Sequence, residues 1–302
     1  MATTQSVSVL GAGFEEAVRP RRHWARNLGV TIRRNPLGFI GFVIIVTLVI
    51  AAVFAPAIAP YRVGDITAGP ANQNPSWAHL FGTDALGRDM FSRVVFGARI
   101  SLAVGFLSVM AATAVATALG IFSGYAGGII DNVIQRIVDT ALAFPLILLL
   151  LILAAVLGPS FWTVVFAIAA AIVFPVTRVV RGAVLSERNN QYVEAARALG
   201  ASTPRILFIH IAPNVTALAI ILATTLLGSA ILGEAALSFL GLGIPVPNPS
   251  WGTDVSSARS SFPIHIWWAF FPGAAITLTV LGFNLLGDAL RDIFDPRLRG
   301  RL

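Results

Sequence analysis

The chain has 302 residues, of which 56% are hydrophobic and 12% are charged, and its mean hydropathy is +0.82. A soluble domain carries about 25% charged residues, because much of its folded surface faces water. We therefore expect lipid to cover this chain, which excludes a water-soluble enzyme and a disordered protein. The sequence has no cysteine and all 21 basic residues are arginine. Thiolate metal sites, cysteine nucleophiles, phosphate-loop lysines and lysine Schiff bases are excluded as well.

Long runs without a charged residue predict membrane-spanning helices, since about 20 residues cross the hydrocarbon. Five such runs occur, and the longest, 140–177, is divided by Gly158-Pro159-Ser160 into two helices. The prediction is an all-α polytopic membrane protein with six spans, at 37–59, 100–123, 137–157, 160–181, 213–236 and 267–288. The first span is longer than a signal-peptide core and precedes Pro60, so we expect an uncleaved anchor.

Arginine placement predicts the orientation, because cytoplasmic loops are enriched in positive charge. Six spans put both termini on one side, and 16 of the 21 arginines fall on that side. The other five are Arg62, Arg88, Arg93, Arg99 and Arg259. We therefore expect both termini in the cytoplasm. The net charge of +7 then reflects topology and anionic lipid rather than nucleic-acid binding.

Two outer segments are too long to be simple connections. In the stretch 60–99, residues 89–96 alternate charged and apolar side chains at helical spacing. We expect them to lie in the membrane interface before the second span. The stretch 242–266 contains three closely spaced prolines, which lack a backbone donor and stiffen the chain. An ordered, non-helical cap is predicted there.

The predicted cytoplasmic loop 181–212 contains a short amphipathic helix. Asn190 suits its N-cap, and Gly200 suits the left-handed residue that ends it. Its apolar residues fall on one helical face and its charged residues on the flanks of that face. The face consists of Tyr192, Ala195, Ala196 and Leu199, with Glu194 and Arg197 beside it. Thr203 is then expected to cap a second helix with Pro204 at its first position, ending at Pro213.

An apolar stripe on a short cytoplasmic helix needs a surface to cover it. Two alternatives follow from the residues alone. The stripe packs on the chain's own helices or on the bilayer surface, or it inserts into the groove of a partner as a docking element.

Glu194-Ala195-Ala196, Gly200 and Ile211-Ala212-Pro213 together resemble the EAA loop of ABC importer permeases, in which leucine is usual where this chain has Ala212. From about residue 35 onward, the chain is also similar to the C-type permease subunit for dipeptides, oligopeptides and nickel. The motifs that carry this similarity are FGTDALGRD at 81–89, GARISL at 97–102, GYAGG at 124–128, AFP at 143–145, EAALSFLGLG at 234–243, PSWG at 249–252, NLLGD at 284–288, LRD at 290–292 and DPRL at 295–298.

The resemblance implies the type I ABC importer permease fold in a bacterial inner membrane. It implies a cytoplasmic tail at 1–35, a first spanning helix with a periplasmic or interfacial segment at 36–96, a core transmembrane domain at 97–288 with the coupling loop 181–212, and a cytoplasmic tail at 289–302. The implied partners are a B-type permease subunit, two ATP-binding subunits and a periplasmic or lipoprotein substrate-binding protein. ATP and Mg would bind to the partner subunits, and this chain would hold no cofactor.

The same resemblance implies that the loop docks on an ATP-binding subunit. The expected coupling residues are Tyr192, Glu194, Ala195, Ala196, Arg197, Gly200, Pro204 and His210. The substrate stays open between dipeptides, oligopeptides, glutathione and nickel.

Polar residues in and beside the spans are functional candidates, because charge in a membrane is costly. Glu234 follows Asn214 by 20 residues, or about 30 Å of helix, which places it near the outer end. It either lines an outer mouth that receives a cationic peptide terminus or hydrogen-bonds the returning outer loop. Ser238, Trp251 and Arg259 are grouped with it as candidate pathway residues.

A second group is assigned to helix packing or gating. Asp139 is expected to pair with Arg136 on one helical face. Pro145 and Pro175 interrupt spans as hinges or as static kinks, and Asn284 and Asp288 are expected to bond a neighbouring helix. The four histidines, His23, His79, His210 and His265, show no metal-ligand spacing, so no metal site is expected.

Two other functions compete with the importer permease. A self-sufficient secondary transporter would need charges near the bilayer midplane and an inverted repeat, whereas the charges here lie near span ends. An intramembrane enzyme would need a nucleophile and a base at membrane depth, and the predicted spans contain no histidine, lysine or cysteine.

Overall fold

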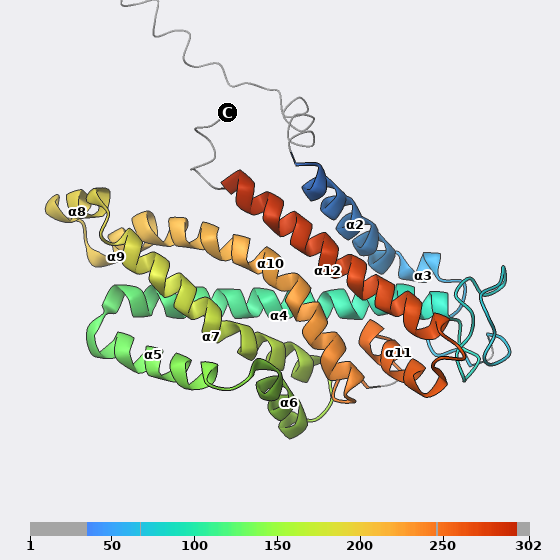
Figure 1. Ribbon diagram of the computed structural model, residues 1–302. Coiled ribbons are helices and arrows are strands. Elements are labelled where there is room, and N and C mark those ends of the chain that lie inside the picture. Colours follow the sequence, from blue (N-terminus) through green and yellow to red (C-terminus); the bar gives the residue numbers. More distant parts are fainter. Residues whose placement is uncertain (1–34, 67, 246, 295–302) are drawn as a thin grey trace, which may run out of the picture.

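The computed structural model describes residues 35–66, 68–245 and 247–294, which are helical apart from loops and one isolated bridge between Thr83 and Asp89 (Figure 1). Its helices are α2 (Pro36–Val53), α3 (Ala55–Ile58), α4 (Met90–Ala126), α5 (Gly128–Leu142), α6 (Leu146–Leu157), α7 (Phe161–Glu187), α8 (Gln191–Ala198), α9 (Thr203–Arg205), α10 (Ala212–Phe239), α11 (Trp251–Ala258) and α12 (Trp267–Phe294), with a π-helix at Ile206–Ile211 and a 3-10 turn at Arg259–Ser261. The predicted tail 1–34 and the motif at 295–298 lie outside the described residues.

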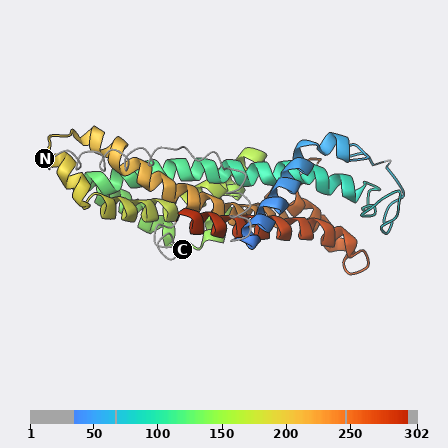
Figure 2. The same cartoon turned by 90° about the horizontal axis from the view of Figure 1, so that it is seen from above.

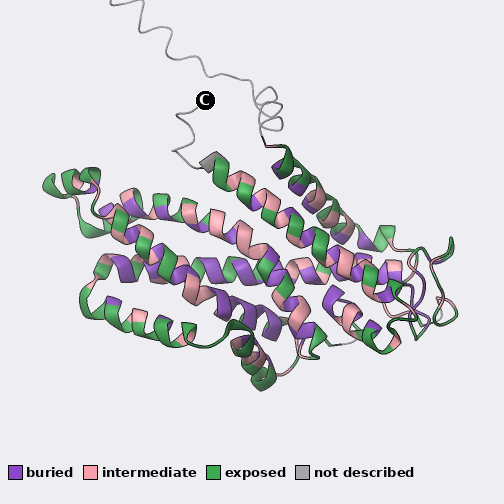
Figure 3. Ribbon diagram, viewed as in Figure 1, coloured by how far each residue is buried: buried purple, intermediate pink, exposed green. Residues whose placement is uncertain are grey.

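The long helices form an elongated bundle with α4 at its centre (Figures 1 and 2). The α8 end and the end that holds α11 and the segment 60–89 lie opposite each other in both views. Small residues on α4 allow close contact, because Gly105 faces Ile231 of α10 and Gly120 faces Val180 of α7. This contact buries much of α4, whereas α2 keeps many exposed positions (Figure 3).

Five helices are long and apolar enough to cross a membrane: α2, α4, α7, α12 and the continuous helix that runs from α9 through α10. The predicted third span at 137–157 falls on helices α5 and α6. These bend by 90° at 143–145, so they make a sixth span only if they count as one. Pro145 explains the break, because it has no backbone donor and disfavours helical geometry in the residue before it.

Residues 90–96 are the start of α4, which runs on into the predicted second span, with Asp89 as its N-cap. Two further local predictions are corrected. The outer cap is partly helical, since Ser250 and Thr253 form a capping box that starts α11 directly after the prolines. The chain also stays helical across Pro213, which occupies the first turn of α10.

Ion pairs tie α5 to α7 near the α8 end. Asp131 binds Arg181 at 2.6 Å, and Asp139 binds Arg178. The predicted pair between Asp139 and Arg136 is therefore wrong, and the Arg136 side chain is exposed. Arg178 lies on the neighbouring helix α7, so its pair with Asp139 also links α5 to α7.

Glycine packing between α2 and α12 leads to a test. A Cβ atom at Gly41 would meet the Gly282 carbonyl oxygen and the Leu285 side chain, whereas one at Gly182 on α7 would meet nothing within 4 Å. Gly41→Ala should lower the free energy of unfolding by about 1–3 kcal/mol. Gly182→Ala should raise it by about 0.5–1 kcal/mol, because alanine favours helix. Thermal unfolding in detergent measures both, and equal shifts of the same sign would contradict this packing.

Candidate functional site

Helix α8 lies beyond the ends of α7 and α10 at one tip of the bundle (Figure 1). Asn190 occupies its N-cap position but does not cap it, since the side chain donates to Glu187 at 2.7 Å. Gly200 has a φ of +80°, as its predicted role as a helix stop requires. The amide of Ala201 donates to the Ala196 carbonyl at 3.0 Å, which completes the C-terminal capping motif.

The two sides of α8 differ in burial. Val193 is fully buried and attaches the helix to the hydrophobic core. Of the predicted stripe, Ala196 is partly buried against that core, whereas Ala195 is exposed and Leu199 is 89% exposed. The chain's own helices therefore leave most of the stripe exposed. Val193 was not among the predicted residues, although its position one residue from Tyr192 marks a second apolar side.

Glu194 and Arg197, predicted on the flanks of the stripe, are both exposed. Pro204 is also exposed and lies at the second position of α9, because Ser202 rather than Thr203 precedes that helix. His210 lies inside the continuous π-helix. The helix continues past it into α10, so His210 does not end a helix.

A hydrogen-bonded cluster connects α8 to both long helices. The Tyr192 hydroxyl donates to Glu187 of α7 at 2.8 Å. The Asn214 amide of α10 donates to Glu187 at 2.6 Å and lies 3.1 Å from the Tyr192 oxygen and from the His210 carbonyl. Burial and the Glu187 carboxylate raise the pKa of the Tyr192 phenol, so its hydroxyl stays protonated at neutral pH. Glu187 and Asn214 were not predicted; they meet each other across 27 positions.

Glu234, at the opposite end, is fully buried. It accepts hydrogen bonds from Ser238 at 2.7 Å and Ser101 at 3.1 Å, and the Ser101 oxygen accepts from the amide of Trp251 at 3.2 Å. Trp251 is itself fully buried, and its indole donates to the Val94 carbonyl at 2.9 Å. Of the two predicted roles for Glu234, these contacts match a link to the returning outer loop, not an exposed mouth.

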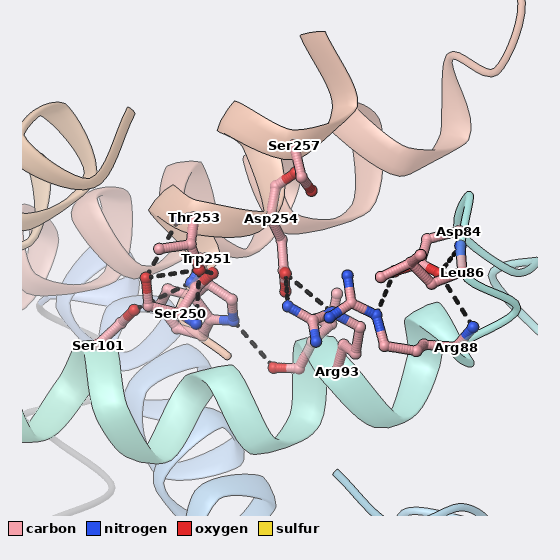
Figure 4. Close-up of polar contacts among 11 residues, drawn as sticks. Asp84, Leu86, Arg88, Arg93, Ser101, Ser250, Trp251, Thr253, Asp254 and Ser257 are labelled. Carbon is pink, nitrogen blue, oxygen red and sulfur yellow. Dashed lines mark hydrogen bonds and ion pairs between the residues drawn. The ribbon is translucent and has the colours of Figure 1, made fainter. Parts of the chain in front are cut away.

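An ion pair holds α11 on α4 beside this cluster (Figure 4). Arg93 donates to Asp254 through Nε at 2.9 Å and through its Nη2 group as well, and both side chains are buried. Arg88 and Asp84 form a second buried pair at 2.6 Å. By contrast, Arg259 is exposed beside a hollow of about 230 Å³. Of the predicted pathway residues, only Arg259 is on the surface; Ser238 is buried.

The remaining predicted residues do not form one site. Pro145 occupies the N-cap of α6, and Pro175 lies inside α7 beside an apolar cavity. Asn284 places its side-chain oxygen beside Gly228 of α10, and both Asn284 and Asp288 are exposed. Among the described residues, no three side chains of the metal-binding types form a group.

A bundle of apolar helices long enough to span a membrane, with a partly exposed amphipathic helix at one tip, defines a helical membrane protein. Residues 116–300 match the family described as binding-protein-dependent transport system inner membrane component. Residues 30–75 match the N-terminal TM domain of oligopeptide transport permease C. The chain belongs to the first of these families by a match over more than half its length.

Curated relatives agree with this assignment. The chain is 44% identical over 283 residues to the dipeptide transport system permease protein DppC of Alkalihalophilus pseudofirmus, covering 94% of this chain and 92% of the relative. It is 42% identical over 269 residues to the glutathione transport system permease protein GsiD of Escherichia coli O1:K1 / APEC, covering 89% of each. The protein is an inner-membrane permease of an ABC importer. The predicted family is confirmed, and a secondary transporter is not favoured.

The cluster that tethers α8 leads to a proteolysis test. Asn214→Ala removes the amide that bridges Glu187 and Tyr192, so α8 should open more often. One lost hydrogen bond of about 1 kcal/mol corresponds to roughly fivefold faster trypsin cleavage at the exposed Arg197. Thr224→Ala is the matched control, because its hydroxyl bonds only within α10. Equal cleavage of the two variants would show that the cluster does not hold α8.

Proposed function

We propose that this permease moves dipeptides, oligopeptides or a related small substrate delivered by a periplasmic or lipoprotein substrate-binding protein. Two observations support this substrate class. The relatives described above are named for dipeptide and glutathione transport, and glutathione is itself a short peptide. The N-terminal match is to a permease domain named for oligopeptide transport.

The second part of the proposal is that α8 docks in a groove of an ATP-binding subunit. The observation that carries it is the exposed Leu199, which stands next to exposed Ala195 on a helix whose other side buries Val193. Burying a leucine side chain contributes about 1.5–3 kcal/mol. Binding in a partner groove would gain this free energy, because this chain leaves the Leu199 side chain exposed. Helix-in-groove binding uses this kind of stripe.

The tether explains how docking would move the spans. Glu187 ends α7 and Asn214 begins α10, and both contact Tyr192 of α8. A displacement of α8 would therefore reach two spanning helices at once. ATP and Mg would act in two partner subunits, one of them held by this chain and the other by a B-type permease subunit.

Orientation completes the proposal. The arginine-rich α8 end and both termini would face the cytoplasm, and the α11 end would face the binding protein. Lipid would surround the exposed apolar side chains of α2. No nucleic acid takes part.

Leu199→Asp tests the docking surface. A buried, unpaired carboxylate in the groove is costly, so co-purification of the ATP-binding subunits should fall at least about tenfold, which corresponds to 1.4 kcal/mol. Ile264→Asp is the control, because Ile264 is 81% exposed near the opposite end. It should keep the ATP-binding subunits. The docking proposal fails if both variants retain them equally.

Gly200→Val tests the geometry of the same loop. Valine at a φ of +80° is strained, and the capping motif after α8 should be lost. Gly241 offers a matched control, since it has a φ of +82° in the same kind of capping motif after α10. We expect Gly200→Val to abolish substrate-stimulated ATP hydrolysis and Gly241→Val to retain association with the ATP-binding subunits. Unchanged ATP hydrolysis and uptake in Gly200→Val would contradict coupling through this loop.

A further inference from the structure

We propose that Arg188 is a positioning residue that makes the turn between α4 and α5, residues 124–128, move together with α8. This inference rests on the proposed docking at α8 and adds a third place that a displacement of α8 would reach. The cluster around Tyr192 leads from α8 to α7 and α10. The contacts of Arg188 lie between segments of this chain, so they do not depend on what covers its surface.

The joint between α7 and α8 is short and hydrogen-bonded. Only residues 188–190 separate the two helices. The Arg188 amide donates to the Val184 carbonyl at 2.9 Å, and the Asn190 amide donates to the Glu187 carbonyl at 3.2 Å. The Asn190 side chain also binds the Glu187 carboxylate at 2.7 Å. Because the joint is held in this way, a displacement of α8 would carry Arg188 with it.

The Arg188 side chain binds the end of α4. Its Nη1 donates to the Gly124 carbonyl at 3.0 Å, across 64 positions of the sequence. Gly124 lies in the last turn of α4, where carbonyl oxygens lack a helical donor and a positive charge is favourable. A Cβ atom at Gly127 would lie 3.8 Å from Nη1, which puts the guanidinium against the turn itself. Figure 1 shows this turn at the same end of the bundle as α8.

A second arginine fixes the other side of the turn. Arg181 donates to the two carboxylate oxygens of Asp131 in α5, through Nε and Nη2, each at 2.6 Å. Asp131 also accepts from the Ser123 hydroxyl of α4. Arg181 precedes Arg188 by seven residues, which is about two helical turns and places both on one side of α7. The two arginines therefore hold the turn at its α5 side and at its α4 side.

The two arginines have different roles because of where they lie. Arg181 is inside α7, so its ion pair holds the turn on α7 wherever α8 lies. Close packing adds to this attachment, since a Cβ atom at Gly124 would lie 2.9 Å from the Val184 Cβ. Arg188 is in the joint, so its bond to Gly124 follows α8. We therefore expect a variant without this bond to fold, with a turn that no longer follows α8.

A distance between two spin labels tests the proposal, and this chain has no cysteine of its own. Ile129→Cys at the start of α5 and Asn189→Cys in the joint carry the labels, since both positions are exposed. The transporter with all its partner subunits is measured in vesicles, without nucleotide and with ATP and vanadate. With Arg188 present, one distance should persist in both states.

Arg188→Met removes every N–H donor of this side chain. The population of a second distance with ATP and vanadate should then rise about tenfold, which corresponds to 1.4 kcal/mol. Arg188→Leu also lacks these donors and replaces Arg188→Met if that variant does not assemble. A single distance in both states without the donors, as with Arg188, would overturn the proposal.

Two further variants separate positioning from a general effect on the fold. Arg188→Lys keeps a charged donor, so it should restore the single distance. Arg136→Met makes the same substitution on α5, where the arginine side chain is exposed, and it should leave the distance unchanged. A second distance as populated in either of these variants as in Arg188→Met would also overturn the proposal.

Failure of this inference and failure of the proposed function can be told apart. The labels report without a transported substrate, so a substrate other than a peptide leaves the outcome unchanged. If α8 does not dock, Leu199→Asp keeps the ATP-binding subunits. If α8 docks but the turn does not follow it, Leu199→Asp loses them while Arg188→Met shows the single distance.

Discussion

The structure depends on one constraint, which is that a backbone surrounded by hydrocarbon must satisfy its own hydrogen bonds. Helices α2, α4, α7, α10 and α12 obey it along their length. Even Pro213 is accommodated within a continuous helix, in the first turn of α10 after a π-helical segment. The break at 143–145 departs from the continuity of these helices, because α5 and α6 bend by 90° there.

Polar contacts between distant segments hold the two ends of the bundle. At the α11 end, Ser101 donates to Glu234 and accepts from the first amide of α11, and Arg93 binds Asp254. Breaking such a buried pair costs about 3–5 kcal/mol, because the remaining charge is left unpaired. At the α8 end, Asp131 and Arg181 join α5 to α7. The apolar middle therefore lies between two polar clusters that restrict how its helices can slide.

Helix α8 is attached to the bundle on one side and exposed on the other. Eight residues are too few to form a stable helix alone. Burial of Val193 and the hydrogen bonds around Asn214 supply the missing stability from one side. The opposite side, with Leu199, stays free for a partner. Its anchors belong to α7 and α10, so under the proposed docking a displacement of α8 would reach both helices.

The sequence by itself determined the class of protein, five of the spans, the glycine stop at Gly200 and the family motifs. These features are local, since they depend on hydropathy over about 20 residues or on the backbone freedom of one glycine. The tertiary structure decided the partners of the polar residues. Asp139 binds Arg178 across 39 positions, and Glu234 meets Ser101 across 133. It also decided that Pro145 breaks its span where Pro175 does not. Which side chain lies opposite another depends on how helices pack, and no spacing along a single helix contains that information.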